Sequence, residues 1–257
     1  MIANYHTHTP RCNHANGTEQ QYADAALQAG LKILGFSDHT PYIFPGEYYS
    51  TFRMRLSQLD DYVQAVLRVR KEYAGKLDIP LGLELEYYPG LLPKLLPILR
   101  DQPMDYLILG QHFIGNEYDA PYSGLVTDDK EVVRQYCRQS MEAMNTGLFT
   151  YFAHPDLIHY QDDWKFYMDS VRPMCAEAKQ CGVPLEINLL GIREGRHYPN
   201  RYFWEMAAEE GCDVILGVDA HSPQAMNHPE SVQKGLALAK EFGLNVLETA
   251  ELRSIHR

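Results

Sequence analysis

The stretch Gln28-Ala29-Gly30-Leu31-Lys32-Ile33-Leu34-Gly35-Phe36-Ser37-Asp38-His39 contains one complete unit of the expected fold. An amphipathic segment ends near Gly30, a residue type that commonly terminates helices. The short apolar run 33–36 follows as a candidate buried strand, and polar residues come directly after it. The same order of helix, glycine and strand recurs along the chain, which predicts repeated βα units.

Apolar runs and amphipathic segments alternate over the whole chain. The predicted strands are residues 2–5, 33–36, 79–85, 106–109, 149–152, 183–187 and 214–218, with 245–248 as a last candidate. The predicted helices are residues 19–29, 56–73, 129–145, 164–180, 202–210 and 229–242. This alternation predicts a parallel sheet, because parallel strands need a crossover connection. No linker-like stretch divides the chain, so we expect one α/β domain over residues 1–257, with a barrel and an open doubly wound sheet as the alternatives.

Ligand-type side chains follow most of the predicted strands. The candidate metal ligands are His6, His8, His14, His39, Glu84, His112, His154, Asp219 and His221. In parallel α/β barrels the loops after the strands converge on one face, so these side chains favour the barrel. Imidazole nitrogens and carboxylate oxygens bind divalent cations, and a catalytic metal takes about four protein ligands or fewer. Nine candidates therefore predict two or three divalent ions (zinc, manganese or iron), with a carboxylate shared between some of them.

Composition limits the other functions. The chain has 257 residues, 34 Asp+Glu and 23 Lys+Arg, for a net charge of −11, which disfavours binding to long nucleic acid. It has no signal-peptide pattern and no apolar run of the roughly 18 residues that a membrane span needs, so we expect no membrane association. Its five cysteines form no CxxC pair, which favours reduced thiols in a cytoplasm. The sequence predicts no oligomeric state.

Together these motifs resemble the polymerase and histidinol phosphatase (PHP) superfamily, from residue 6 to residue 221. The resemblance implies a distorted (β/α)7 TIM-like barrel and three metals. The first metal would be held by His6, His8, Glu84 and Asp219, the second by Glu84, His112 and His154, and the third by His14, His39 and His221. The chain length and the segment Gln111-His112-Phe113-Ile114-Gly115-Asn116 look most like the histidinol-phosphate phosphatase family.

The resemblance also implies a function, which is hydrolysis of L-histidinol phosphate to L-histidinol and phosphate by a metal-activated hydroxide. Glu84, Asp219 and His221 are the candidate catalytic residues. The candidate substrate contacts after the sixth strand are Asn188, Arg193, Arg196 and His197. An arginine fork matches phosphate oxygens, and Arg193 fits the arginine used by related phosphatases better than Arg196. The sequence identifies no general acid for the leaving group.

Other interpretations remain open at this point. The same site could act on another small phosphorylated metabolite, a nucleotide or phosphotyrosine. An amidohydrolase-like barrel also opens with His-x-His, although it usually has eight units. A metal-dependent sensor would need no catalysis. The aromatic loop 41–55 could be a lid over the substrate or a packed insertion, and Glu86 could be an acid behind the ligands or a rim carboxylate.

Overall fold

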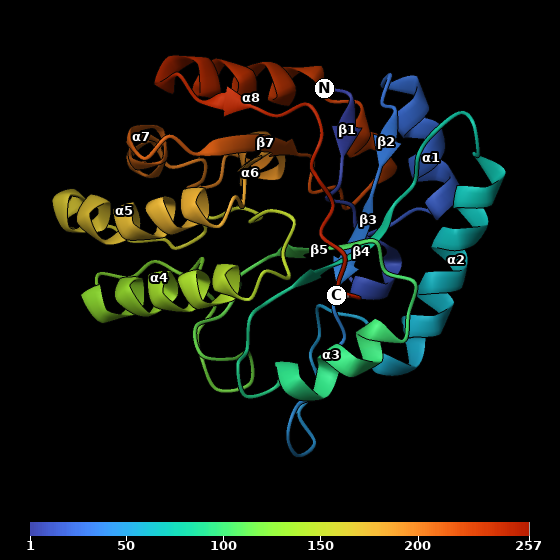
Figure 1. The fold of residues 1–257 in the computed structure, drawn as a ribbon, viewed down its shortest axis with the longest axis horizontal. Coiled ribbons are helices and arrows are strands. Elements are labelled where there is room, and N and C mark those ends of the chain that lie inside the picture. The colour runs from blue at the N-terminus through green and yellow to red at the C-terminus, as the bar shows by residue number, and fades with distance from the viewer. Residues whose placement is uncertain (257) are drawn as a thin grey trace.

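Parallel strands form the centre of the molecule and helices cover the outside (Figure 1). The computed structural model describes residues 1–256. Its strands are β1 (Ala3–Asn4), β2 (Ile33–Leu34), β3 (Phe36–His39), β4 (Leu81–Leu85), β5 (Tyr106–Leu109), β6 (Leu185–Asn188), β7 (Asp213–Gly217) and β8 (Asn245–Val246). Its helices are α1 (Glu19–Gln28), α2 (Leu59–Glu72), α3 (Leu92–Arg100), α4 (Lys130–Asn145), α5 (Trp164–Gln180), α6 (Leu189–Glu194), α7 (Arg201–Glu209) and α8 (Pro229–Phe242).

The strands close into a ring. β1 pairs with β2, while β3, β4 and β5 form one parallel group and β6, β7 and β8 another. Single bridges from Phe152 to Leu109 and to Leu185 join β5 to β6. A bridge between Thr7 and Ala220 joins the ends of β1 and β7. The ring of seven predicted strand positions is therefore closed but irregular, which confirms the distorted barrel over the open sheet.

Most elements begin and end within three residues of the predicted bounds. The larger departures concern two strands and the unpredicted helices α3 and α6. The strand predicted at 149–152 is reduced to the bridging residue Phe152. The strand predicted at 33–36 is interrupted at Gly35 and then continues to His39, so Ser37 and Asp38 lie inside it. Helix α3 was not predicted, because Pro93 and Pro97 disturb its pattern; Pro93 lies in the first turn, where a missing N–H costs little.

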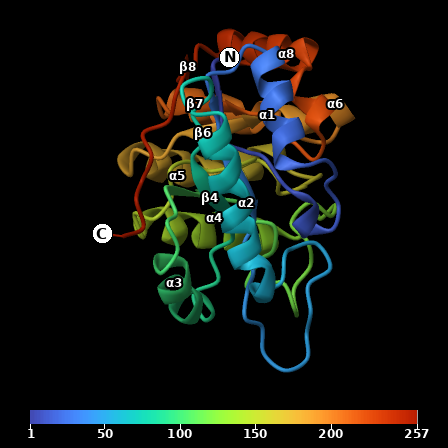
Figure 2. The ribbon, with the colours of Figure 1, turned by 90° about the vertical axis from the view of Figure 1, so that its right-hand side faces the viewer.

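A small apolar cluster fills the inside of the barrel below the strand ends. Its centre is Tyr106, whose hydroxyl lies 2.7 Å from the carbonyl oxygen of Tyr5 and 3.0 Å from that of Phe36. Ala250 and Leu252, from the segment after β8, pack against this cluster. Figure 2 shows this segment running along one side of the molecule to the C-terminus. Among residues 1–256, no helix combines the length and hydropathy that crossing a bilayer requires.

Gly82 of β4 leaves the space that the Tyr106 ring occupies. A Cβ atom at position 82 would lie 2.5 Å from two atoms of that ring. We expect Gly82→Ala to lower the free energy of unfolding by about 1–3 kcal/mol, because overpacking displaces the ring. Gly90→Ala is the control, since nothing lies within 4 Å of its added Cβ. Urea unfolding measures both, and equal stabilities would contradict the packing described here.

Candidate metal centre

The nine predicted ligands converge at the carboxyl ends of the strands. β1, β5 and β7 are each followed by ligand residues, His39 ends β3, and Glu84 lies within β4. Eight of the nine border a cavity of about 560 Å³, and His6 lies immediately beneath it against Glu84 and Asp219. The barrel closure thus places residues more than 200 positions apart, such as His14 and His221, at one site, with their Nε2 atoms 3.0 Å apart.

Glu84 lies at the centre of this group and is fully buried. One carboxylate oxygen lies 2.9 Å from His154 Nε2 and 3.5 Å from His112 Nε2. The other lies 3.0 Å from His39 Nδ1 and 3.6 Å from Nε2 of both His6 and His8. Burial raises the pKa of Glu84, but the surrounding imidazoles outweigh burial and hold that pKa well below its usual range. Glu84 is therefore an ionised carboxylate that contacts five potential metal ligands.

Asp219 completes the inner group after β7. Its Oδ1 lies 3.3 Å from His8 Nε2, 3.6 Å from His6 Nε2 and 3.3 Å from His221 Nδ1. Asp219 and His154 have positive φ angles of 49° and 33°. A non-glycine residue rarely adopts this backbone region, and such strain often accompanies functional sites. The backbone is thus bent at two of the positions that aim side chains into the cavity.

The donor atoms of these residues fit divalent cations. Several buried atoms that face one another lack a hydrogen-bond partner: His6 Nε2, His8 Nε2, His39 Nδ1, Glu84 Oε2 and Asp219 Oδ1. Leaving buried polar atoms unpaired is costly, and a cation would satisfy several of them at once. Donor atoms lie within 4.8 Å of one another in the trios His6–His8–Asp219, His6–Glu84–His154 and His14–His39–His221. The first trio lies within the first expected ligand set and the last trio is the third set, whereas His6–Glu84–His154 combines residues of the first and second sets around their shared Glu84.

Three further carboxylates lie behind the inner histidines. The sequence analysis left Glu86 open between this position and the rim, and it assigned no role to Asp38 or Glu186. Glu186 lies 2.9 Å from His6 Nδ1, and Glu86 lies 2.9 Å from His112 Nδ1. Asp38 lies 3.4 Å from His8 Nδ1. Carboxylates in this position orient a ligating imidazole and increase its basicity. Burial lowers the pKa of His8, but contacts with Asp219 and Asp38 outweigh burial and raise it to about 9.

Two glycines make room for these buried carboxylates. A Cβ atom at Gly110 would overlap the carboxylate of Glu84, and one at Gly217 would overlap that of Glu186. Neither glycine has a positive φ, so the need is for space and not for an unusual backbone. The sequence signal available for Glu186 was Gly217, a glycine at the end of the neighbouring strand β7. Without that glycine, Glu186 resembles an ordinary acidic residue.

The four predicted substrate contacts lie in different surroundings. Arg193 Nη2 donates to the carbonyl oxygen of Asp219 at 3.2 Å, while its Nη1 is buried without a partner. Arg196 borders the cavity and pairs with Glu194. The amide of Asn188 is buried and donates to Asp219 Oδ2 at 3.0 Å.

His197 contacts a backbone carbonyl and a neighbouring imidazole ring. Its Nε2 lies 2.7 Å from the carbonyl oxygen of Leu157, and its ring stacks on His159 with centroids 3.8 Å apart. The structure therefore brings Arg196 to the cavity and places Asn188 and Arg193 against Asp219. Neither Arg193 nor His197 borders the cavity.

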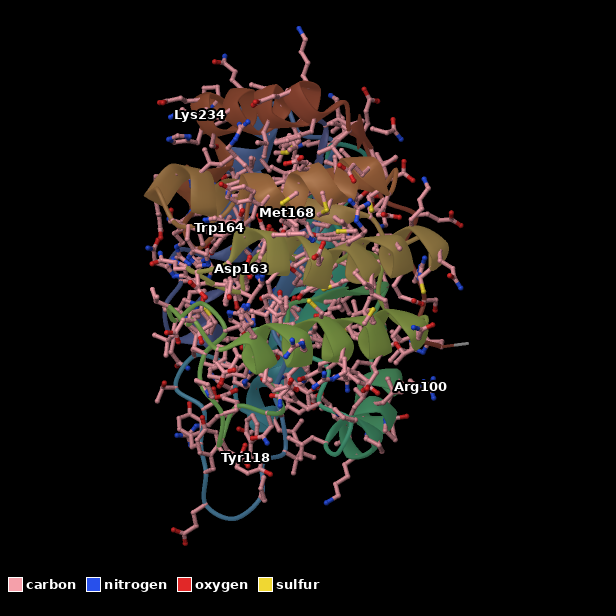
Figure 3. The ribbon with its side chains drawn as sticks, turned by 90° about the vertical axis from the view of Figure 1, so that its left-hand side faces the viewer. Arg100, Tyr118, Asp163, Trp164, Met168 and Lys234 are labelled. Carbon is pink, nitrogen blue, oxygen red and sulfur yellow. The ribbon has the colours of Figure 1, made fainter. Side chains whose placement is uncertain are left out.

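An aromatic wall formed by Phe52, Phe113 and Tyr122 borders one side of the cavity. Phe52 comes from loop 41–55 and packs edge-on against His39, with centroids 5.1 Å apart. The tip of this loop projects from the body of the molecule (Figure 2). Tyr118, labelled near that loop in Figure 3, contacts Tyr48 with ring centroids 6.2 Å apart. The sequence analysis had not identified Phe113 or Tyr122 as lining residues.

The fold and site define a class of protein, the α/β barrels that gather potential metal ligands at the carboxyl ends of their strands. The model of the PHP domain family matches residues 4–189, so the chain belongs to this family and the resemblance found in the sequence is confirmed. The matched range contains seven of the nine candidate ligands, whereas Asp219 and His221 lie beyond it.

Named relatives match most of the chain. A probable histidinol-phosphatase of Deinococcus radiodurans is 34% identical over 232 residues, which cover 86% of this chain and 87% of the relative. The histidinol-phosphatase of Bacillus subtilis is 26% identical and covers 84% and 92%, respectively. The crystal structure of histidinol phosphate phosphatase from Lactococcus lactis, complexed with zinc, L-histidinol and phosphate, matches with a TM-score of 0.76 at 20% identity, covering 100% of this chain and 98% of that one.

The overlap at Gly110 gives a test of the central carboxylate. We expect Gly110→Ala to displace Glu84 and to weaken retention of bound metal by about 10–100-fold, the range seen when support for ligands is lost. Metal content per chain after dialysis against graded chelator measures this, with Gly90→Ala as the control. Unchanged retention in folded Gly110→Ala protein would show that the position of Glu84 does not govern metal binding.

Proposed function

We propose that this protein is a metal-dependent phosphomonoesterase that hydrolyses L-histidinol phosphate to L-histidinol and phosphate. The observation that carries the proposal is the ionised, fully buried Glu84 with five imidazoles around it and unpaired donor atoms facing it. The substrate is supported by the histidinol-phosphatase relatives, one of which is 34% identical over most of both chains.

The ligand sets that the family resemblance implies are supported by the contacts around Glu84 and Asp219. His6, His8, Glu84 and Asp219 would hold the first ion, and Glu84 would be shared with a second held by His112 and His154. His14, His39 and His221 would hold a third. Mixed imidazole and carboxylate sites accept zinc, manganese or iron, and the Lactococcus lactis structure contains zinc. We therefore propose two or three divalent ions.

The protein's own residues would bind and orient the phosphate ester. Clustered divalent cations neutralise phosphate oxygens, and they lower the pKa of a water molecule bound to them to near neutrality. Glu84 and Asp219 would hold the surrounding imidazoles in place. His221, which is partly exposed, would lie on the solvent side of these ligands. Arg193 reaches Asp219 from the end of α6 and has a free Nη1, so we propose that it binds a phosphate oxygen. Asn188 would act by holding Asp219.

The organic half of the substrate would lie beside the aromatic wall. An imidazole ring or an ammonium group is attracted to aromatic faces, and Phe52, Phe113 and Tyr122 supply such a surface next to the metal ligands. Glu194 and Arg196 border the same cavity. A cavity of about 560 Å³ suits a small metabolite. All five cysteines are free thiols, which supports a reaction in the cytoplasm.

The substrate assignment predicts a clear preference among phosphate esters. With metal-reconstituted protein, we expect kcat/KM for L-histidinol phosphate to exceed that for glycerol phosphate, phosphotyrosine and a nucleoside monophosphate by at least about tenfold, equivalent to about 1.4 kcal/mol of transition-state binding. Phosphate release measures each rate. If phosphotyrosine or the nucleotide were preferred, the substrate assignment would be wrong while the phosphomonoesterase activity would stand.

The central role of Glu84 predicts a loss that does not depend on the substrate. We expect Glu84→Gln to reduce kcat at least about a hundredfold with every ester, because loss of a ligand exceeds the 10–100-fold cost of losing support behind one. Glu248→Gln, an exposed change of the same kind, should leave kcat as in wild type. Glu84→Gln protein with more than a tenth of wild-type kcat would contradict the proposed site.

A further inference from the structure

Arg53 is a buried arginine at the end of the aromatic loop, with only 1% of its surface exposed. Its Nη1 and Nη2 atoms donate to the two carboxylate oxygens of Glu86 at 3.0 and 2.8 Å. Its Nε donates to Glu117 at 2.8 Å, and Nη1 also donates to the carbonyl oxygen of Thr40 at 2.8 Å. Burying a charge is costly unless its partners are held in good geometry, and here both ends of the guanidinium are engaged.

Glu86 extends this contact to the metal centre. The carboxylate oxygen that accepts from Arg53 Nη2 also lies 2.9 Å from His112 Nδ1, and the other nitrogen of His112 faces Glu84. Arg53, Glu86 and His112 therefore form one continuous buried chain that ends at a proposed metal ligand.

The other two carboxylates behind the histidines are held differently. Glu186 accepts from the backbone amide of His154 and from the side chain of Asn188, and Asp38 accepts from Thr9. Among the described residues, neither of them pairs with an arginine or a lysine. Of these three carboxylates, Glu86 alone pairs with an arginine, and that arginine belongs to loop 41–55 and not to a barrel strand.

The same guanidinium organises the cavity wall. It lies 4.4 Å from the centroid of the Phe52 ring, which borders the cavity. Its partner Glu117 accepts from the Tyr48 hydroxyl at 2.9 Å, and the Tyr42 hydroxyl donates to the backbone of Glu86. One buried side chain thus joins the two ends of loop 41–55, the segment around Glu117 and the residue that orients His112.

We propose that Arg53 is a positioning residue that couples the aromatic loop to the metal held by His112. A metal bound at His112 fixes Glu86 and, through Arg53, the loop; a fixed loop in turn increases the affinity for that metal. Such coupling must be reciprocal, with typical factors of 5–150-fold. Arginine is required because its planar fork spans two carboxylates, which a lysine ammonium cannot reproduce. The inference rests on the proposed use of metal, but not on the identity of the phosphate ester.

Metal retention tests the coupling from the loop to the metal. Zinc-loaded wild type, Arg53→Met, Arg53→Lys and His112→Ala are exposed to chelator, and the zinc remaining per chain is followed over time. We expect Arg53→Met to lose one ion at least about fivefold faster than wild type, with the others retained, as in His112→Ala. Arg55→Met is the matched control, because Arg55 is exposed and stacks on Tyr49 at 4.3 Å outside the cavity.

Proteolysis of the loop tests the coupling in the opposite direction. Tyr48 and Tyr49 are 41% and 45% exposed, so chymotrypsin can cleave there when the loop opens locally. We expect zinc to slow this cleavage at least about fivefold in wild type and in Arg55→Met, and to have no effect in Arg53→Met. Mass spectrometry of the fragments locates the cleavage, and circular dichroism confirms that each variant is folded.

The outcomes separate this inference from the proposed function. If wild type retains no zinc, the proposed metal site fails, and the inference with it. If wild type retains zinc but the Arg53 variants behave like Arg55→Met in both assays, the inference alone is wrong. Equal loss of all ions from Arg53→Met would also overturn it, because coupling requires loss at one site. Should Arg53→Met fail to fold, Arg53→Lys decides, with the same fivefold thresholds.

Discussion

The structure depends on keeping the ionised Glu84 buried among imidazoles. A carboxylate removed from water is costly unless charge and hydrogen-bonding partners surround it, and Glu84 has five imidazoles within 3.6 Å. These partners come from four strand positions, with His6 and His8 both after β1, so the arrangement exists only when the ring of strands is closed. The bridges through Phe152 and between Thr7 and Ala220 therefore serve the site as much as the fold. Gly110 provides the space next to the carboxylate.

Much of this arrangement could be predicted from the sequence. Regular alternation of apolar runs and amphipathic segments indicates parallel strands. Glycines mark where helices end before the next strand begins. Parallel strands place their carboxyl ends on one side, so histidines and acids in those positions had to lie near one another. Both steps use local patterns with a fixed geometric consequence. For this reason all nine candidate ligands converge, and the family resemblance that they suggested is confirmed.

The supporting residues could not be predicted in the same way, because their partners are chosen by tertiary packing. Nothing near Arg53 in the sequence indicates that it pairs with Glu86, 33 positions away, or that Glu86 in turn contacts His112. Nothing in the neighbouring sequence distinguishes Glu186 of β6 from other acidic residues, and only the structure shows that it lies behind His6. His197 could not be placed correctly for the same reason. It follows the strand β6 in the sequence, as predicted, but its ring stacks on His159. Proximity to a strand end indicates a region of the site, whereas orientation depends on neighbours from distant segments.

Part of the net charge of −11 is concentrated at the candidate metal centre. Five of the acidic residues, Asp38, Glu84, Glu86, Glu186 and Asp219, are buried at the metal centre and together carry a formal −5. Arg53 and Arg193 contribute +2, so these seven side chains carry a formal charge of −3 without metal. Two divalent ions would change it to +1, and three would change it to +3. A phosphate dianion is attracted only where the local charge is positive, and bound ions are the largest charges in such a site. Bound divalent ions would therefore reverse the sign of the local charge, which explains how a strongly acidic chain could accept a phosphate ester.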